Sequence, residues 1–218
     1  MSEGTNAPGS HDFETLSSET LYSGAILALR RDQVRMPGGQ TAEREVIEHH
    51  GAVAVAAIDE DDSVVLINQY RHPIGARLLE LPAGLLDLPG EDPLAAAKRE
   101  LAEETGLAAR EWSVLVDVVL SPGFTDEALR VYLARGLYET DRPEPELEEA
   151  DIQVLRMPVR EAVRAALAGE IVNATAVAGV LALAAARAGD VTPRAEDAPW
   201  AGRPEAFVRR KAAQRSQD

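Results

Sequence analysis

The sequence predicts an α/β fold in which a mixed β-sheet lies between helices. Two observations lead to this class: short Val-, Ile- and Leu-rich runs bounded by turn residues, and three stretches with helical signals, one in the middle of the chain and two near its end. The chain has 218 residues, of which 45% are hydrophobic, so it can bury one sizeable core with an appendage or form two small domains.

The first 49 residues read as a polar terminus followed by a block of strands. Residues 1–12 are small and polar, and we expect them to be disordered. Strands are expected at residues 20–29, 33–36 and 43–49, with a Pro-Gly-Gly turn between the last two. The block at residues 13–49 is too small to bury much by itself, so we expect it to pack on the rest of the chain or on a second copy.

A main domain at residues 50–189 and a tail at residues 190–218 follow. Strands are expected at residues 51–58, 63–69, 78–81, 112–120, 128–137 and 152–157, the first two as a hairpin or as neighbouring strands. Helices are expected at residues 93–104, 159–167 and 173–187, and the last is apolar nearly all round, so it should be buried. The Pro-, Arg- and Ala-rich tail gives no readable signal for its path.

Composition argues against several classes of function. The net charge is −15, from 37 acidic and 22 basic residues, which disfavours a nucleic-acid backbone as partner. There is no cysteine, so disulfides and Cys-ligated zinc are excluded. The N-terminus has no signal-peptide pattern, and the apolar stretch at residues 174–186 is shorter than the roughly 20 residues of a membrane span. We therefore expect a soluble cytoplasmic protein with neither a membrane nor a nucleic-acid partner.

The expected helix at residues 93–104 carries an acidic group. Glu100, Glu103 and Glu104 are spaced i, i+3, i+4 and so share one face, where their like charges repel. Asp92 suits the N-cap, and Gly106 can end the helix in a left-handed conformation. A divalent cation among the carboxylates would explain the arrangement. A solvated face with ion pairs to Lys or Arg is the alternative.

The residues around this helix form a longer pattern. In order, its members are Glu91, Arg99, Glu100, Glu103, Glu104 and Gly106. Their spacing resembles the box motif of the Nudix hydrolases. The family pattern opens with a Gly and leaves five residues between it and the first Glu, whereas here six residues, 85–90, separate Gly84 from Glu91. The additional residue falls in a turn-like stretch, where a loop can absorb it.

The resemblance implies an α/β/α sandwich with a mixed sheet, and metal-assisted attack of water on a diphosphate with Mg²⁺ or Mn²⁺ as cofactor. It implies three metal ligands: the backbone carbonyl of Ala83 and the carboxylates of Glu100 and Glu104. It also implies that Glu103 assists or binds through water, that Arg99 orients a box glutamate and that Glu91 holds the loop. For Arg99 and Glu91, a surface ion pair and a helix-dipole partner are the alternatives.

The resemblance places the catalytic base outside the helix. Similar enzymes take it from an acidic loop after the box, which in this sequence contains Glu148 and Glu149. We assign the base to Glu149, with Glu148 as the neighbouring candidate and a solvated acidic loop as the alternative.

Substrate choice rests on residues outside the box. Pro122 stands sixteen residues after Gly106, an offset that marks the ADP-ribose pyrophosphatase group, and Glu127 ends a loop similar to that group's active-site loop. Arg44 and Arg71 lie where similar enzymes place arginines that contact the diphosphate, and bidentate contact with phosphate suits a guanidinium. A turn-forming proline and surface arginines at strand ends are the alternatives.

The resemblance spans about residues 11–190. It implies that the N-terminal antiparallel strands exchange with a second subunit to give a homodimer, and that the reaction is hydrolysis of ADP-ribose to AMP and ribose 5-phosphate. Another ADP-sugar or nucleotide sugar is the alternative substrate. A non-catalytic nucleotide sensor is an alternative of another class.

Overall fold

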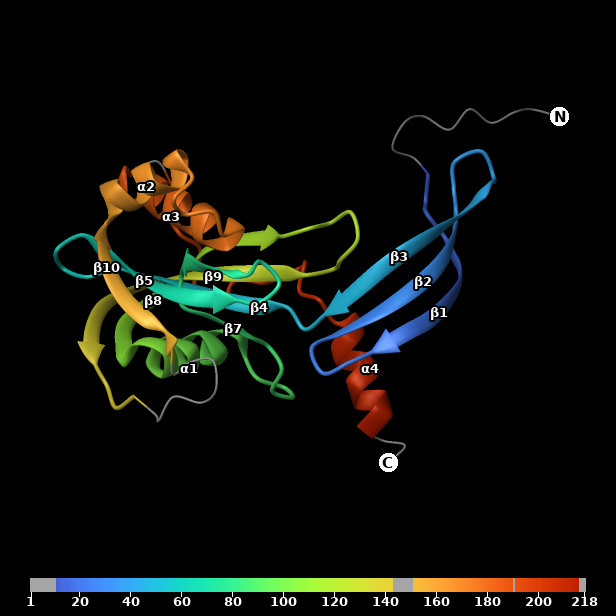
Figure 1. The fold of residues 1–218 in the computed structure, drawn as a ribbon, viewed down its shortest axis with the longest axis horizontal. Helices are drawn as coiled ribbons and strands as arrows, with labels where there is room; N and C mark the ends of the chain where they lie inside the picture. Colours follow the sequence, from blue (N-terminus) through green and yellow to red (C-terminus); the bar gives the residue numbers. More distant parts are fainter. Residues whose placement is uncertain (1–10, 143–150, 190, 216–218) are drawn as a thin grey trace. The chain divides into compact units, whose positions relative to one another are not determined.

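The fold was analysed in a computed structural model, which describes residues 11–142, 151–189 and 191–215 (Figure 1). The described residues form two compact units. The smaller unit lies within residues 1–50, 121–127 and 204–218, and the larger within residues 51–120 and 128–203. Each unit is described by itself.

The smaller unit contains a three-stranded antiparallel sheet in the order β1-β2-β3. Its strands are β1 (Thr15–Ser23), β2 (Leu27–Arg35) and β3 (Thr41–His49). The expectation of one strand over residues 20–29 is wrong, because a turn interrupts it: the Gly24 N–H donates to the Leu27 carbonyl at 2.9 Å. The apolar run therefore belongs to two strands, and the expected strand at residues 33–36 is the end of β2.

Helix α4 (Ala206–Arg215) packs on this sheet, so the tail contains an element that no sequence pattern predicted. Phe207 is fully buried and meets the His50 ring edge-to-face, with ring centroids 4.6 Å apart. Arg210 donates to both carboxylate oxygens of Glu48, at 2.6 and 2.9 Å, and Arg30 donates to the same carboxylate at 3.0 Å. Residues near the C-terminal end of the chain thus pack against the last of the N-terminal strands.

The larger unit contains two sheets. The four-stranded sheet has the order β7-β4-β9-β8, with strands β4 (Ala52–Ala57), β7 (Ala83–Leu85), β8 (Leu107–Val119) and β9 (Ala128–Glu139). Strands β4 and β9 are parallel and the other pairs are antiparallel, which confirms the predicted mixed sheet. Every residue of β4 is buried, as expected for a central strand covered on both faces.

The second sheet of this unit is antiparallel and has the order β10-β5-β6. Its strands are β10 (Gln153–Pro158), β5 (Ser63–Arg71) and β6 (Ala76–Glu80). The expected strands at residues 51–58 and 63–69 therefore do not form a hairpin: they belong to different sheets and meet at an isolated bridge between Ile58 and Val64.

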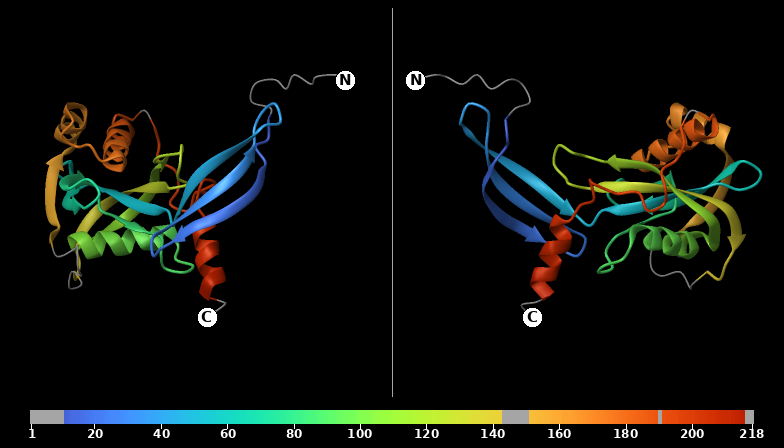
Figure 2. Two further views of the ribbon diagram at one scale, coloured as in Figure 1. Left: turned by 45° about the vertical axis from the view of Figure 1, so that its right-hand side comes forward. Right: turned by 180° about the vertical axis from the view of Figure 1, so that it is seen from behind.

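Helices cover both faces of the sheets, with α1 (Pro93–Thr105) on one side and α2 (Val159–Ala168) and α3 (Ala174–Arg187) on the other (Figure 2). This confirms the α/β/α arrangement. Helix α3, which we expected to be buried, is buried on one face only: Val180 and Leu183 are fully buried, whereas Leu181 is 38% exposed. None of the described helices is long and apolar enough to cross a membrane.

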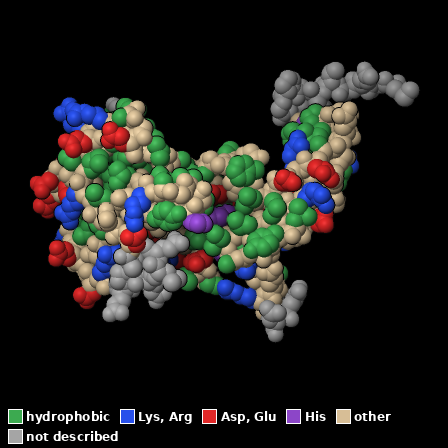
Figure 3. All heavy atoms as spheres, in the orientation of Figure 1, with side chains coloured by type: hydrophobic (Ala, Val, Ile, Leu, Met, Phe, Trp, Pro, Cys, Tyr) green, Lys and Arg blue, Asp and Glu red, His purple; other side chains and the backbone are tan. Residues whose placement is uncertain are grey.

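Charged side chains of both signs are interspersed over the surface of the larger unit in the face that Figure 3 shows. In the smaller unit, several large apolar side chains on or next to β1 are exposed: Leu16, Leu21, Tyr22 and Ile26.

Candidate active site

Helix α1 has well-defined ends that fix the register of its acidic residues. One carboxylate oxygen of Asp92 accepts hydrogen bonds from the N–H groups of Leu94 at 2.9 Å and Ala95 at 3.2 Å. At the other end, Gly106 adopts a left-handed conformation with φ of 70°, and its N–H donates to the Ala102 carbonyl. Both predicted caps are confirmed, and the glutamates share the face that the spacing predicted.

Two of the helix glutamates are buried against the short strand β7. Glu100 is 9% exposed and Glu104 is 4% exposed. The Ala83 N–H donates to Oε2 of Glu104 at 2.9 Å. A Cβ added at Gly84 would lie 1.9 Å from the carboxyl carbon of Glu100, so only glycine leaves room for this carboxylate. The structure therefore brings together Ala83, Glu100 and Glu104, which the sequence predicted as neighbours.

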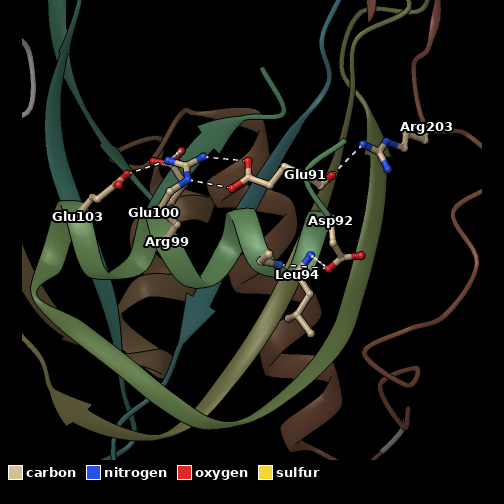
Figure 4. Close-up of polar contacts among 8 residues, drawn as sticks. Glu91, Asp92, Leu94, Arg99, Glu100, Glu103 and Arg203 are labelled. Atoms are coloured by element: carbon tan, nitrogen blue, oxygen red, sulfur yellow. Dashed lines mark hydrogen bonds and ion pairs between the residues drawn. The ribbon is translucent and has the colours of Figure 1, made fainter. Parts of the chain in front are cut away.

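Arg99 lies at the centre of the acidic group (Figure 4). It donates to both carboxylate oxygens of Glu91, at 3.0 and 3.2 Å, in a two-pronged contact. Its Nη1 donates to Glu100 at 2.7 Å and to Glu103 at 2.8 Å. The hydrogen bond to Glu91, together with the charge of Glu100 and hydrogen bonds to Glu103 and Glu100, outweighs desolvation and raises the pKa of the Arg99 guanidinium above its ordinary value.

The donor set of this site suits a hard divalent cation. Among the described residues, no three His, Cys, Asp or Glu side chains are arranged to hold a metal ion as they stand, and the carboxylates of Glu100 and Glu103 instead point to Arg99. Buried carboxylates require a nearby positive charge, and carboxylate oxygens beside a backbone turn are ligands that Mg²⁺ and Mn²⁺ prefer. The recess that Gly84 leaves for Glu100 fits such a site.

Arg71 at the end of β5 is held by Glu80 at the end of β6. Its Nε and Nη2 donate to the two oxygens of Glu80, at 2.9 and 2.7 Å. Side chains alternate along a strand, so Arg71 shares a face with Val65, which packs in the core beneath α1. Glu80 is 3% exposed and was missed by sequence reasoning. Its position on the expected strand two residues before Pro82 was the available signal.

Three predicted site residues belong to the smaller unit. Arg44 lies on β3 and donates to the Glu43 carbonyl at 2.7 Å. The loop that contains Pro122 is tied to β3, because the Ile47 N–H donates to the Phe124 carbonyl at 2.7 Å. Glu127 follows this loop, with its carboxylate 3.9 Å from His49 Nδ1.

Asp126 next to Glu127 was not predicted as a site residue. It accepts the His49 N–H at 2.8 Å, and its burial raises the pKa of the carboxyl group above its ordinary value. The predicted site residues are thus divided between the two units. The predicted base Glu149 and its neighbour Glu148 lie outside the described residues.

Comparison with known protein families agrees with the box pattern. The NUDIX domain model matches residues 48–177, and the model of the nucleoside diphosphate sugar hydrolase N-terminal domain matches residues 13–47. The chain belongs to the Nudix family. The additional residue in its Nudix box is accommodated in a turn before α1, where the Glu91 N–H donates to the Leu88 carbonyl and Gly90 has φ of 76°.

Curated relatives and a solved structure extend this assignment. An ADP-ribose pyrophosphatase of Mycobacterium tuberculosis is 57% identical over 202 residues, which cover 93% of this chain and 98% of the relative. A methanol dehydrogenase activator of Bacillus methanolicus is 38% identical, over 69% of this chain and 81% of the relative. The crystal structure of an ADP compounds hydrolase aligns with a TM-score of 0.69 at 23% identity, covering 83% of this chain and 96% of that one. The structural likeness confirms the Nudix fold.

Proposed function

We propose that this Nudix protein hydrolyses the diphosphate of ADP-ribose to AMP and ribose 5-phosphate with the help of Mg²⁺ or Mn²⁺. The observation that carries the proposal is the 57% identity, over nearly the whole chain, to an ADP-ribose pyrophosphatase. The closely packed Nudix box supports it, because the predicted ligands lie together on α1 and β7.

In this proposal the carboxylates of Glu100 and Glu104 and the Ala83 carbonyl hold the metal, and Glu103 assists. A bound divalent ion would neutralise the phosphate oxygens and make a bound water more acidic. Arg99 orients Glu100 and Glu103 through the contacts described above. Its own position follows from Glu91, which holds the guanidinium from the other side.

Arg71 and Arg44 contact the diphosphate in this proposal, and Pro122 and Glu127 shape the loop on the substrate side. Arg71 is the better supported of the two, because the buried carboxylate of Glu80 fixes its guanidinium on the side of β5 that faces α1. Glu149 accepts the proton from the attacking water. Comparison of Glu149→Gln with Glu148→Gln tests this assignment, since loss of turnover in Glu148→Gln alone would move the base by one residue.

The proposal includes a homodimer and a cytoplasmic location. Exposed apolar side chains on β1, such as Leu21 and Tyr22, support a second subunit at the N-terminal strands. The proposed organisation has residues 1–12 as a terminus, 13–49 as the dimerisation block, 50–189 as the hydrolase domain and 190–218 as a tail. Light scattering on the full chain measures the oligomeric state, and a monomer at micromolar concentration would exclude this dimer.

A second candidate substrate is another ADP-sugar or nucleotide sugar. The proposed metal ligands and Arg71 and Arg44 recognise the metal-bound diphosphate, and all these compounds contain a diphosphate. Incubation with ADP-ribose, ADP-glucose and GDP-mannose in Mg²⁺, followed by chromatography of the nucleotide products, separates the candidates. We expect fastest release of AMP from ADP-ribose. Better cleavage of another member of the panel would reassign the substrate, and cleavage of none would favour a non-catalytic sensor.

A further inference from the structure

Residues 191–203 form an ordered segment that follows the sheet of the larger unit, and we call it the C-terminal strap. Near its start, Arg194 pairs with Val114 of β8: the Val114 N–H donates to the Arg194 carbonyl at 2.9 Å, and the Arg194 N–H donates back at 3.0 Å. The Arg194 side chain also donates to Asp117 at 2.9 Å. The strap is therefore joined to β8 through both backbone and side-chain contacts.

A buried arginine anchors the middle of the strap. Arg130 on β9 is 3% exposed and donates to the backbone carbonyls of Ala198 at 2.7 Å and Pro199 at 3.0 Å. It also donates to both oxygens of Asp117, and its guanidinium lies 5.0 Å from the ring centroid of Trp200. The strap accepts part of the hydrogen bonds of this buried guanidinium, so displacing the strap would leave Nη1 of Arg130 without the Ala198 carbonyl as its partner.

The strap ends beside the N-terminus of α1. Ala198 and Trp200 pack in the core that also contains Ala96, Ala97 and Leu101 of α1. Arg203 then donates to the backbone carbonyl of Glu91 at 3.3 Å (Figure 4). Glu91 is the residue whose carboxylate holds Arg99, which in turn holds Glu100 and Glu103. A continuous series of contacts thus connects the strap to the carboxylates of the box.

We propose that the C-terminal strap positions the Nudix box, with Arg203 as the positioning residue that holds Glu91. This inference rests on the proposed metal-dependent function. The loop between Gly84 and Glu91 has one residue more than the family pattern, so its backbone can take more than one path between these two residues. Arg203 holds the Glu91 backbone. Trp200, whose ring lies against Arg130, accepts the Arg203 N–H through its carbonyl at 3.3 Å and so fixes the Arg203 backbone. Arg203 touches neither metal nor substrate and acts through Glu91 and Arg99.

Three variants of the full chain test this role: Arg203→Ala, Arg203→Lys and, as matched control, Arg164→Ala, whose side chain lies on the exposed side of α2. Mn²⁺ affinity is measured without substrate by titration calorimetry, together with kcat and KM for ADP-ribose and the Tm of each variant. We expect Arg203→Ala to weaken Mn²⁺ binding and lower kcat by about threefold to tenfold each, below the effect of losing a residue that contacts a metal ligand directly. KM for ADP-ribose should stay within about twofold of wild type, because substrate contacts are not removed.

Arg203→Lys should recover most of both losses, since an ammonium group can donate to the same carbonyl. Arg203→Ala should add little when combined with Glu91→Gln, because the two act in series. Wild-type Mn²⁺ affinity and kcat in Arg203→Ala would overturn the proposal, as would an equal loss in Arg164→Ala or a loss that follows a lowered Tm alone. If wild type binds Mn²⁺ but releases no AMP, the proposed function fails, while the Mn²⁺ comparison still decides the role of the strap.

Discussion

The guanidinium of Arg99 donates hydrogen bonds to both carboxylate oxygens of Glu91, eight residues upstream, at 3.0 and 3.2 Å. This contact ties the loop before α1 to the helix face that carries the glutamates. A two-pronged ion pair restricts the orientation of the guanidinium, so its remaining nitrogen is directed at Glu100 and Glu103. The acidic face of α1 is therefore ordered from outside the helix.

Glu91→Gln should loosen this arrangement without changing its shape. The amide keeps one acceptor but loses the charge, so we expect the free energy of unfolding to fall by about 1–2 kcal/mol. In ADP-ribose hydrolysis, kcat should fall about threefold to tenfold, because the carboxylates lose their fixed orientation. Chemical denaturation and steady-state kinetics measure the two effects, with the exposed Glu170→Gln as control. Unchanged kcat would show that Glu91 does not order the site.

Gly84→Ala should displace the carboxylate of Glu100. The added Cβ would lie 1.9 Å from its carboxyl carbon, so the side chain must leave its recess. We expect Mn²⁺ affinity to fall at least about tenfold. The isosteric variant Glu100→Gln separates charge from position, because it keeps the recess filled and removes the negative charge. Wild-type Mn²⁺ affinity in Gly84→Ala would mean that Glu100 is not a ligand.

Asp117 should make the stability of the larger unit depend on pH. Burial alone would raise the pKa of its carboxyl group, but hydrogen bonds and charge from Arg130 and Arg194 outweigh burial and lower the pKa below 3.8. A group with a lowered folded-state pKa stabilises the protein above its unfolded pKa, and that stability is lost as the pH falls through the folded value. Asp117→Asn should therefore be less stable than wild type by about 3 kcal/mol at pH 7, since it leaves Arg130 buried without its partner charge.

The difference between Asp117→Asn and wild type should begin to narrow as the pH falls below about 4, where the carboxyl group of an unfolded Asp is protonated, and should narrow further as the pH falls through the lower folded-state pKa of Asp117. Urea denaturation at a series of pH values measures this difference. The exposed Glu111→Gln should follow wild type throughout. A difference that stays constant from pH 7 to pH 3 would contradict the assignment of the effect to this carboxylate.

Arg71 and Glu80 should act as a pair in substrate binding. We expect Arg71→Ala to raise KM for ADP-ribose about tenfold or more, the cost of a charged hydrogen bond to phosphate. Glu80→Gln should raise KM less, about threefold, and the double variant should be no worse than Arg71→Ala alone. Arg77→Ala is the matched control, because Arg77 lies opposite Tyr70 and so faces the other side of the sheet. Additive effects of the two single variants would separate Glu80 from Arg71.

Local signals made α1 predictable from the sequence. Asp92, the following proline and Gly106 fix its ends through short-range hydrogen bonds and backbone preference, so its bounds and its acidic face followed directly. The start of α3, expected at residue 173, also follows from a local signal, because the Asn173 side chain accepts the Ala176 N–H at 2.9 Å and caps the helix. The buried face of α3 could not be predicted, because an apolar composition alone does not reveal which side of the helix faces the sheet.

Elements held by contacts between residues far apart in the sequence could not be predicted. Helix α4 has a single buried anchor, Phe207, and no amphipathic stripe, so its packing depends on the N-terminal sheet some 160 residues earlier. The C-terminal strap depends on Arg130, and Glu80 became visible as a site residue only through its contact with Arg71. The strand expected at residues 20–29 was wrong because the turn at Gly24 interrupts a continuous apolar run.

Product analysis of ADP-ribose hydrolysis in Mg²⁺ tests most directly whether the Nudix box is a metal-dependent hydrolase site. Wild type and Glu104→Gln are compared at equal concentration. Wild type should release AMP and ribose 5-phosphate in equal amounts, and Glu104→Gln should lose turnover by about a thousandfold while keeping its fold by circular dichroism, because a metal ligand is removed. Release of no AMP by wild type, or turnover at the wild-type rate in Glu104→Gln, would contradict this account of the site.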